Sequence, residues 1–130
     1  MTYSHAAAAY REREVLTASP AQLVVIVYDH ALANLTRARM AFQAGNIEAR
    51  VEATGKARDA LVELMATLDV ERGGPLAENL RGLYGFLINQ LLDLGLHPDT
   101  RMLDRVTKMV AELRSAFASI AERAAEAPAA

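Results

Sequence analysis

The sequence offers few side chains that could carry out catalysis or hold a metal ion. It contains no cysteine, which excludes disulfides, thiolate metal ligands and cysteine nucleophiles. The Glu-x-x-His pairs that build carboxylate-bridged metal sites inside helical bundles are also missing. Neither a glycine-rich phosphate loop nor a Gly-x-Ser-x-Gly nucleophile motif occurs. We therefore expect no catalytic residues, no metal, no other cofactor and no enzymatic activity.

His30 is the one side chain for which a chemical role has to be weighed. A solvent-facing histidine on a helical bundle can accept a phosphoryl group in phosphotransfer domains. Those sites follow a His-x-x-Lys-Gly pattern in which the lysine stabilises the phosphate, whereas Ala33 and Asn34 occupy the two positions here. An ordinary surface or boundary histidine is the simpler interpretation. A phosphotransfer bundle stays open as an alternative function.

The composition is typical of one folded domain in the cytosol. The chain has 130 residues, of which 52% are hydrophobic and 23% charged, and a domain of this length can bury one core. Its longest strongly apolar run, residues 23–28, is far shorter than the ~20 residues needed to cross a bilayer, and no signal peptide precedes it. The net charge is −2 with basic residues scattered along the chain, so nucleic acid is not expected as a partner.

Helical periodicity predicts an all-α fold, an antiparallel four-helix bundle. Gly, Pro and Asn signals separate four long segments, expected as helices at about 20–43, 47–69, 75–94 and 98–123. Ser19 can cap the first helix, and Gly73-Gly74-Pro75 predicts the turn before the third. We expect residues 1–18 to be a short, mobile N-terminal segment packing on the bundle, 19–123 the bundle itself and 124–130 a disordered tail.

The first and third predicted helices carry apolar residues on more than one side. In the third helix, we expect Leu80, Leu83 and Leu87 to fill the interior, which leaves a second apolar stripe facing outwards. Gly85, in the middle of this helix, is expected to mark the close approach of another backbone. The five residues that we expect to line a partner-binding groove on the outward faces are Ile26, Tyr28, Tyr84, Ile88 and Leu91.

The N-terminal segment carries three apolar anchors, Tyr10, Val15 and Leu16. It is too short to form a core of its own, so we expect it to lie against the bundle or against a partner. The surplus apolar surface is compatible with three arrangements. The N-terminal segment covers it, a partner binds it as an exposed groove, or the protein is a structural bundle that buries it by self-association.

Several motifs at fixed spacings resemble the N-terminal signature of the FliS family of flagellar export chaperones. That signature has an Ala-Tyr pair, then Val-x-Thr-Ala-Ser-Pro and Leu-Tyr-Asp-Gly; residues 9–10 and 15–20 match the first two, and Tyr28 and Asp29 match the middle of the third. His30 replaces the usual Gly, and Val27 the usual Leu. The likeness continues through residues 45–48 and 73–84 and covers about residues 9–121.

The resemblance implies a cytosolic chaperone that binds the C-terminal segment of flagellin as its client. Members of the family keep flagellin from polymerising prematurely and deliver it to the flagellar type III export gate. Their own N-terminal segment occupies part of the groove when no client is bound, and Tyr10, Val15 and Leu16 match that segment. A possible homodimer would bury the same apolar surface, and neither nucleic acid nor membrane insertion is implied.

Overall fold

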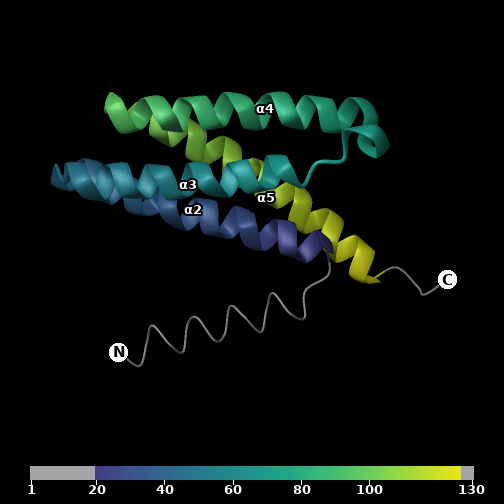
Figure 1. Ribbon diagram of the computed structural model, residues 1–130. Helices are drawn as coiled ribbons and strands as arrows, with labels where there is room; N and C mark the ends of the chain where they lie inside the picture. The colour runs from purple at the N-terminus through teal and green to yellow at the C-terminus, as the bar shows by residue number, and fades with distance from the viewer. Residues whose placement is uncertain (1–19, 127–130) are drawn as a thin grey trace.

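The computed structural model describes residues 20–126, which form four α-helices and contain no β-strand (Figure 1). The helices are α2 (Pro20–Ala44), α3 (Ile47–Ala66), α4 (Val70–Leu96) and α5 (Thr100–Glu126). The prediction of an all-α four-helix bundle is confirmed. The expectations for residues 1–18 and for the last four residues of the tail lie outside the described residues. The fourth helix continues to Glu126, beyond its predicted end at 123.

The helices pack in an order that does not simply follow the chain. The antiparallel pair α2 and α3 lie side by side, and α4 covers the far side of α3 (Figure 1). From the end of α4, α5 crosses the bundle obliquely and packs mainly against α2, whereas α4 and α5 share few contacts. The end of α5 therefore lies close to the beginning of α2.

Two ion pairs fix the register of α5 on α2. Arg114 Nε lies 2.8 Å from Asp29 Oδ1, and Arg39 Nε lies 3.1 Å from Asp104 Oδ1. From the first pair to the second, the chain advances ten residues along α2 and goes back ten along α5, as an antiparallel pair requires. All four side chains are partly exposed, so each pair contributes at most about 1 kcal/mol to stability. Their main effect is to select one alignment of the two helices.

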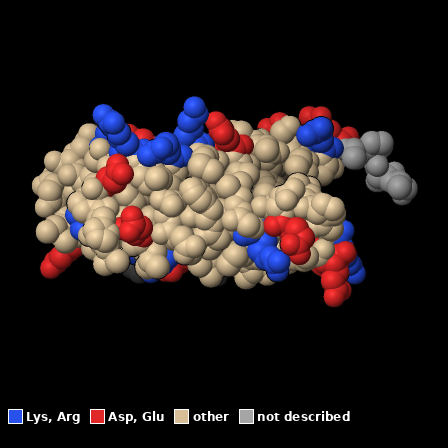
Figure 2. All heavy atoms as spheres, turned by 90° about the horizontal axis from the view of Figure 1, so that it is seen from above, with Lys and Arg blue, Asp and Glu red and all other residues tan. Residues whose placement is uncertain are grey.

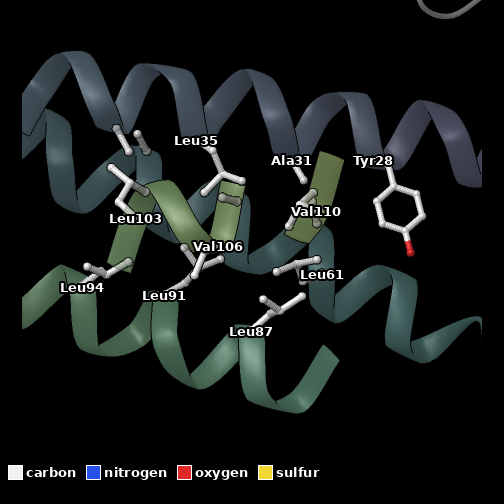
Figure 3. Close-up of a cluster of buried hydrophobic side chains, with 14 of the residues drawn as sticks. Tyr28, Ala31, Leu35, Leu61, Leu87, Leu91, Leu94, Leu103, Val106 and Val110 are labelled. Carbon is white, nitrogen blue, oxygen red and sulfur yellow. The ribbon is translucent and has the colours of Figure 1, made fainter. Parts of the chain in front are cut away.

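The core runs along the middle of the bundle and takes leucine and valine side chains from all four helices (Figure 3). Val106 and Val110 of α5 project between α2 and α4, where they meet Leu35 and Leu91. Alanines dominate the contact between α2 and α3, which lets these two helices pack closely. The buried alanines of these two helices are Ala31, Ala38, Ala41, Ala53, Ala57 and Ala60.

The connection between α3 and α4 differs from the prediction. The helix α3 ends at Ala66, and α4 begins at Val70 because the Asp69 side chain caps it, accepting a hydrogen bond from Arg72 N at 3.1 Å. The expected turn at residues 73–75 is a kink inside α4, where Gly74 has φ 56° and ψ −137°. Only glycine adopts this conformation readily, and Pro75 suits the first position of the helix that resumes after it.

Gly85 does not mark a close approach within the bundle. A Cβ atom added to Gly85, or to Gly82 one turn earlier, would meet no atom within 4 Å among the described residues. The expectation of a neighbouring backbone at Gly85 was therefore wrong for the chain's own described helices. Both glycines cost helix stability without a packing reason inside the bundle.

Replacing Gly74 by alanine should destabilise the protein, whereas the same change at Gly82 should stabilise it. At Gly74 the positive φ imposes strain on any side chain, with an expected cost of about 1 to 3 kcal/mol. At Gly82 the added methyl group meets open space, and alanine should gain up to about 1 kcal/mol through helix propensity. Urea denaturation of both variants measures the two effects. A neutral Gly74→Ala variant would contradict the kink.

Candidate functional site

Three of the five residues expected on an outward-facing groove lie inside the core. Tyr28, Tyr84 and Leu91 are buried, whereas Ile26 and Ile88 are only partly buried. The expectation that Leu87 fills the interior is confirmed, but Tyr84 and Leu91 were wrongly expected to face outwards, because the inward side of α4 is formed by Tyr84, Leu87, Leu91 and Leu94. Leu80 and Leu83 lie at the boundary of the core instead.

The two buried tyrosines meet at one end of the core. Their hydroxyl groups hydrogen-bond to each other, and the Tyr28 ring lies 5.4 Å from the Phe117 ring of α5, centroid to centroid. Burial raises the pKa of both phenols, and the hydrogen bond to Tyr84 raises the pKa of Tyr28 further. Both hydroxyls therefore stay protonated at physiological pH and satisfy each other inside an apolar environment.

An apolar groove of about 390 Å³ opens next to the tyrosine pair. It lies where α2 begins, α3 ends, α4 begins and α5 approaches its end, so that all four helices contribute to it. Tyr84 is the one residue of the predicted groove that lines it. The lining consists of Val24, Leu64, Thr67, Leu68, Asp69, Arg72, Gly73, Leu76, Ala77, Leu80, Tyr84 and Phe117.

The rim of this groove is shaped by the kink in α4. The kink at Gly74 gives residues 70–73 a different direction from the rest of α4. Arg72 and Asp69 form a charged edge there, with Arg72 Nε 3.5 Å from Asp69 Oδ2. Just after the kink, Leu76 is 68% exposed. A mostly apolar hollow with an exposed leucine and a charged edge is suited to apolar side chains of a polypeptide partner.

The beginning of α2 lies beside this groove. Val24 lines the groove one turn after Pro20, where the described part of the chain begins. The predicted anchors Tyr10, Val15 and Leu16 lie outside the described residues. Sequence reasoning missed Leu68, Leu76 and the other groove residues at the α3 to α4 connection, although the Gly-Gly-Pro motif had marked an irregular backbone there.

The surplus apolar surface of α4 is found at different residues from those expected. Between Arg81 and Asp93, α4 has no charged residue, and Phe86 and Leu92 are exposed on it. Seen from the side on which α4 lies, the middle of the surface is a broad uncharged area (Figure 2). The uncharged stretch of α4 follows directly after the groove along the helix, because Leu80 and Tyr84, which line the groove, lie on the same helix.

No candidate metal site is found among residues 20–126. That part of the chain has no group of three or more His, Asp or Glu side chains that could hold a metal ion. His30 is exposed on α2, and its ring contacts the amide of Asn34 with Nε2 and Nδ2 3.4 Å apart, not a lysine. None of the four described helices is long and apolar enough to cross a membrane.

Comparison with known proteins places the chain in a family. The family model for the flagellar protein FliS matches residues 3–124, which is nearly the whole chain. The chain belongs to the FliS family. It is 35% identical over 109 residues to the flagellar secretion chaperone FliS of Vibrio cholerae serotype O1, an alignment that covers 84% of this chain and 80% of that protein.

Two further relatives have the same kind of name. The chain is 35% identical over 114 residues to the flagellar secretion chaperone FliS of Salmonella typhimurium, covering 87% of this chain and 84% of the relative. It is 34% identical over 109 residues to the flagellar secretion chaperone FliSB of Pseudomonas aeruginosa, covering 84% and 86%. The relatives are named as chaperones and not as enzymes, in line with the absence of catalytic motifs from this sequence.

The buried tyrosine pair should make the protein lose stability at alkaline pH. Both phenol pKa values are raised in the folded state, so the folded protein keeps protons that the unfolded chain loses near pH 10. The free energy of unfolding should therefore fall as pH rises above about 10. Urea denaturation at neutral and alkaline pH should show a smaller fall for the Tyr28→Phe, Tyr84→Phe double variant than for the parent. An equal fall in both proteins would contradict the assignment.

Proposed function

We propose that this protein is an export chaperone that binds the C-terminal segment of flagellin, prevents its premature polymerisation and aids its delivery to the flagellar type III secretion apparatus. The observation that carries the proposal is the apolar groove at the α3 to α4 connection, with Leu76 exposed at its rim. Membership of the FliS family, with relatives named flagellar secretion chaperones, supports a flagellar client, and the family resemblance implies that this client is flagellin.

The chemistry of the groove fits such a client. The family resemblance implies a client segment that is amphipathic and disordered before assembly, so its apolar side chains need cover until export. Fully burying one leucine side chain is worth about 1.5 to 3 kcal/mol, and a groove of this size accepts only a few such side chains. The affinity should then depend on a small number of anchors and not on the whole wrapped area.

The proposed client site combines the groove with the partly buried residues beside it. Leu76 and Leu80 of α4 are the anchors that we assign to the groove, and Tyr84 forms its floor together with Phe117. From the predicted set, Ile26 and Ile88 retain some exposure and are proposed as flanking contacts. Tyr28 and Leu91 would act from inside the core, by supporting the residues that touch the client.

We assign the N-terminal anchors Tyr10, Val15 and Leu16 the role of a cap that competes with the client. The support is positional, since the chain enters α2 beside the groove and Val24 lines it. In this proposal the chaperone works in the cytosol, without a cofactor and without catalysis, and its partners are flagellin and the export gate. It contacts neither nucleic acid nor the interior of a membrane, and a homodimer would have to use the same apolar surface.

Leu76→Asp should weaken binding of the purified flagellin C-terminal segment by at least about tenfold, because a charge replaces an apolar anchor at the rim. Leu96→Asp is the matched control, since Leu96 lies on the same helix, is 71% exposed and lies outside the groove. Calorimetric titration measures binding, and thermal melting checks that both variants keep their stability. Equal affinities of the two variants would move the client site elsewhere.

Deleting residues 1–16 should raise the affinity for the same flagellin segment, because the client no longer competes with the cap. Helicity and melting temperature should change little, and circular dichroism measures both. Light scattering with and without the segment separates a chaperone, which forms a 1:1 complex, from a structural bundle that only self-associates. Loss of folding in the truncated protein would show that the segment belongs to the core.

A further inference from the structure

A partly exposed apolar surface lies along the contact between α3 and α4, which pack side by side (Figure 1). Arg50 and Thr54 of α3 face Gly95 of α4. Arg50 Nη2 donates a hydrogen bond to the Gly95 carbonyl oxygen at 3.3 Å, and Thr54 Oγ1 lies 3.7 Å from the place of a Cβ atom on Gly95. On both helices, the next positions around the helix, away from the core, repeat at helical spacing and line one surface. This α3–α4 surface consists of Gly55, Arg58, Val62, Gly85, Ile88 and Leu92.

The α3–α4 surface leaves large aliphatic side chains uncovered. Val62 is 43% exposed and Leu92 is 51% exposed, whereas Ile88 packs partly against the core. A Cβ atom added to Gly85 would meet no atom within 4 Å, so a second backbone can come close to α4 there. Among residues 20–126, no other helix covers this side, because α2 contacts α3 on its alanine side and α5 packs mainly against α2. The surface is therefore open to a partner.

Arg58 places an unpaired charge on this surface. It is only partly exposed, yet it forms no ion pair or hydrogen bond within the part of the chain that the structure describes. Its Nη2 atom lies 3.8 Å from the place of a Cβ atom on Gly55, so the guanidinium stays close to the helix. Arg81, one turn before Gly85 on α4, differs because it pairs with Glu78 at 3.2 Å. A partly desolvated guanidinium without an acidic neighbour is complementary to a carboxylate.

The polarity of the α3–α4 surface favours a helix over an extended chain as its occupant. Apart from Arg58, its residues offer no polar side chain, and the backbone groups of α3 and α4 are already used inside these helices. An extended chain would turn backbone N–H and C=O groups towards apolar side chains, whereas a helix satisfies these groups internally. The occupant that fits is thus an amphipathic helix with a carboxylate in or beside its apolar stripe.

We propose that Arg58 is a specificity residue, which pairs with an Asp or Glu on a helical part of the client laid along the α3–α4 surface. The inference rests on the proposed function and adds a charge requirement to the apolar one. The surface is continuous with the apolar groove, because Tyr84 lines the groove and Ile88 lies one turn further along α4. One client segment can therefore anchor apolar side chains in the groove and continue as a helix over Ile88 and Leu92.

Reversing the charge at Arg58 tests the proposal. Arg58→Glu should weaken binding of the purified flagellin C-terminal segment at least about tenfold, because two carboxylates then face each other. Arg105→Glu is the matched control, since Arg105 is an exposed arginine of α5 without an ion pair among residues 20–126. The control makes the same change in net charge and should leave binding unchanged. Calorimetric titration measures both affinities, and thermal melting checks the fold.

Charge swaps between the two partners identify the carboxylate. Each Asp and Glu of the flagellin segment is replaced by lysine in turn and titrated against the parent and Arg58→Glu proteins. One of these client variants should bind the parent more weakly than the original segment does, and bind Arg58→Glu about tenfold more tightly than the original segment does. If no client variant restores binding to Arg58→Glu, Arg58 does not meet a client carboxylate and the inference is wrong.

Other occupants of the α3–α4 surface would give different results, and each would overturn the inference. A parent dimer that Arg58→Glu abolishes in light scattering without client would assign the surface to a second copy of the chain. Tighter client binding by Arg58→Glu, lost after deletion of residues 1–16, would assign it to the N-terminal segment.

Equal affinities of Arg58→Glu and Arg105→Glu also overturn the inference. The proposed function survives that result if Leu76→Asp still weakens binding, and it fails if the parent protein does not bind the segment at all. Should Arg58→Glu fail to fold, Arg58→Gln decides in its place, with an expected loss of about fivefold in affinity, because it removes the charge and keeps most of the side chain.

Discussion

The oblique packing of α5 against α2 is the constraint on which the rest of the structure depends. Because α5 begins beside the end of α4 but stays against α2, from the Arg39–Asp104 pair to the Asp29–Arg114 pair, α4 and α5 diverge along their length (Figure 1). Val106 and Val110 fill the space between α2 and α4 in the middle. Towards the beginning of α2, Phe117 and the tyrosine pair fill it only in part, and the groove remains. The site is therefore a consequence of the crossing of α5, together with the α3 to α4 connection that supplies Thr67, Leu68 and Asp69 to its lining.

The helices themselves could be predicted from the sequence, because caps and breakers are local signals. The first helix was predicted to end at residue 43 and ends at Ala44, and the second begins at Ile47 as predicted. The start of α4 was not, since an aspartate that caps a helix and a glycine that kinks one produce similar local patterns. A cap and a kink can be told apart only by whether the residues before Pro75 are helical when packed in the bundle, which a local pattern does not report.

The faces of α4 could not be assigned from periodicity. Leucines occur on nearly every side of this helix, so each of several stripes satisfies a three-four repeat equally well. The structure selects the stripe with Tyr84 and Leu91, because Tyr84 meets Tyr28 and the two hydroxyls have to be buried together. The tyrosine hydrogen bond thus adds to the burial of Leu87, Leu91 and Leu94 on the inward face. No pattern in one sequence reports a pairing between residues 56 positions apart.

The kink at Gly74 bears on how a bound segment can be released. The first turn of α4 forms one wall of the groove, and a single glycine joins this turn to the long part of the helix. Moving that wall breaks few core contacts, because Ala77 is the first buried residue of α4 and lies after the kink. The residues of α4 before the kink can therefore shift at little cost to the packing of the core. In the proposed function, this arrangement would let the dissociation rate of the client change without loss of the fold.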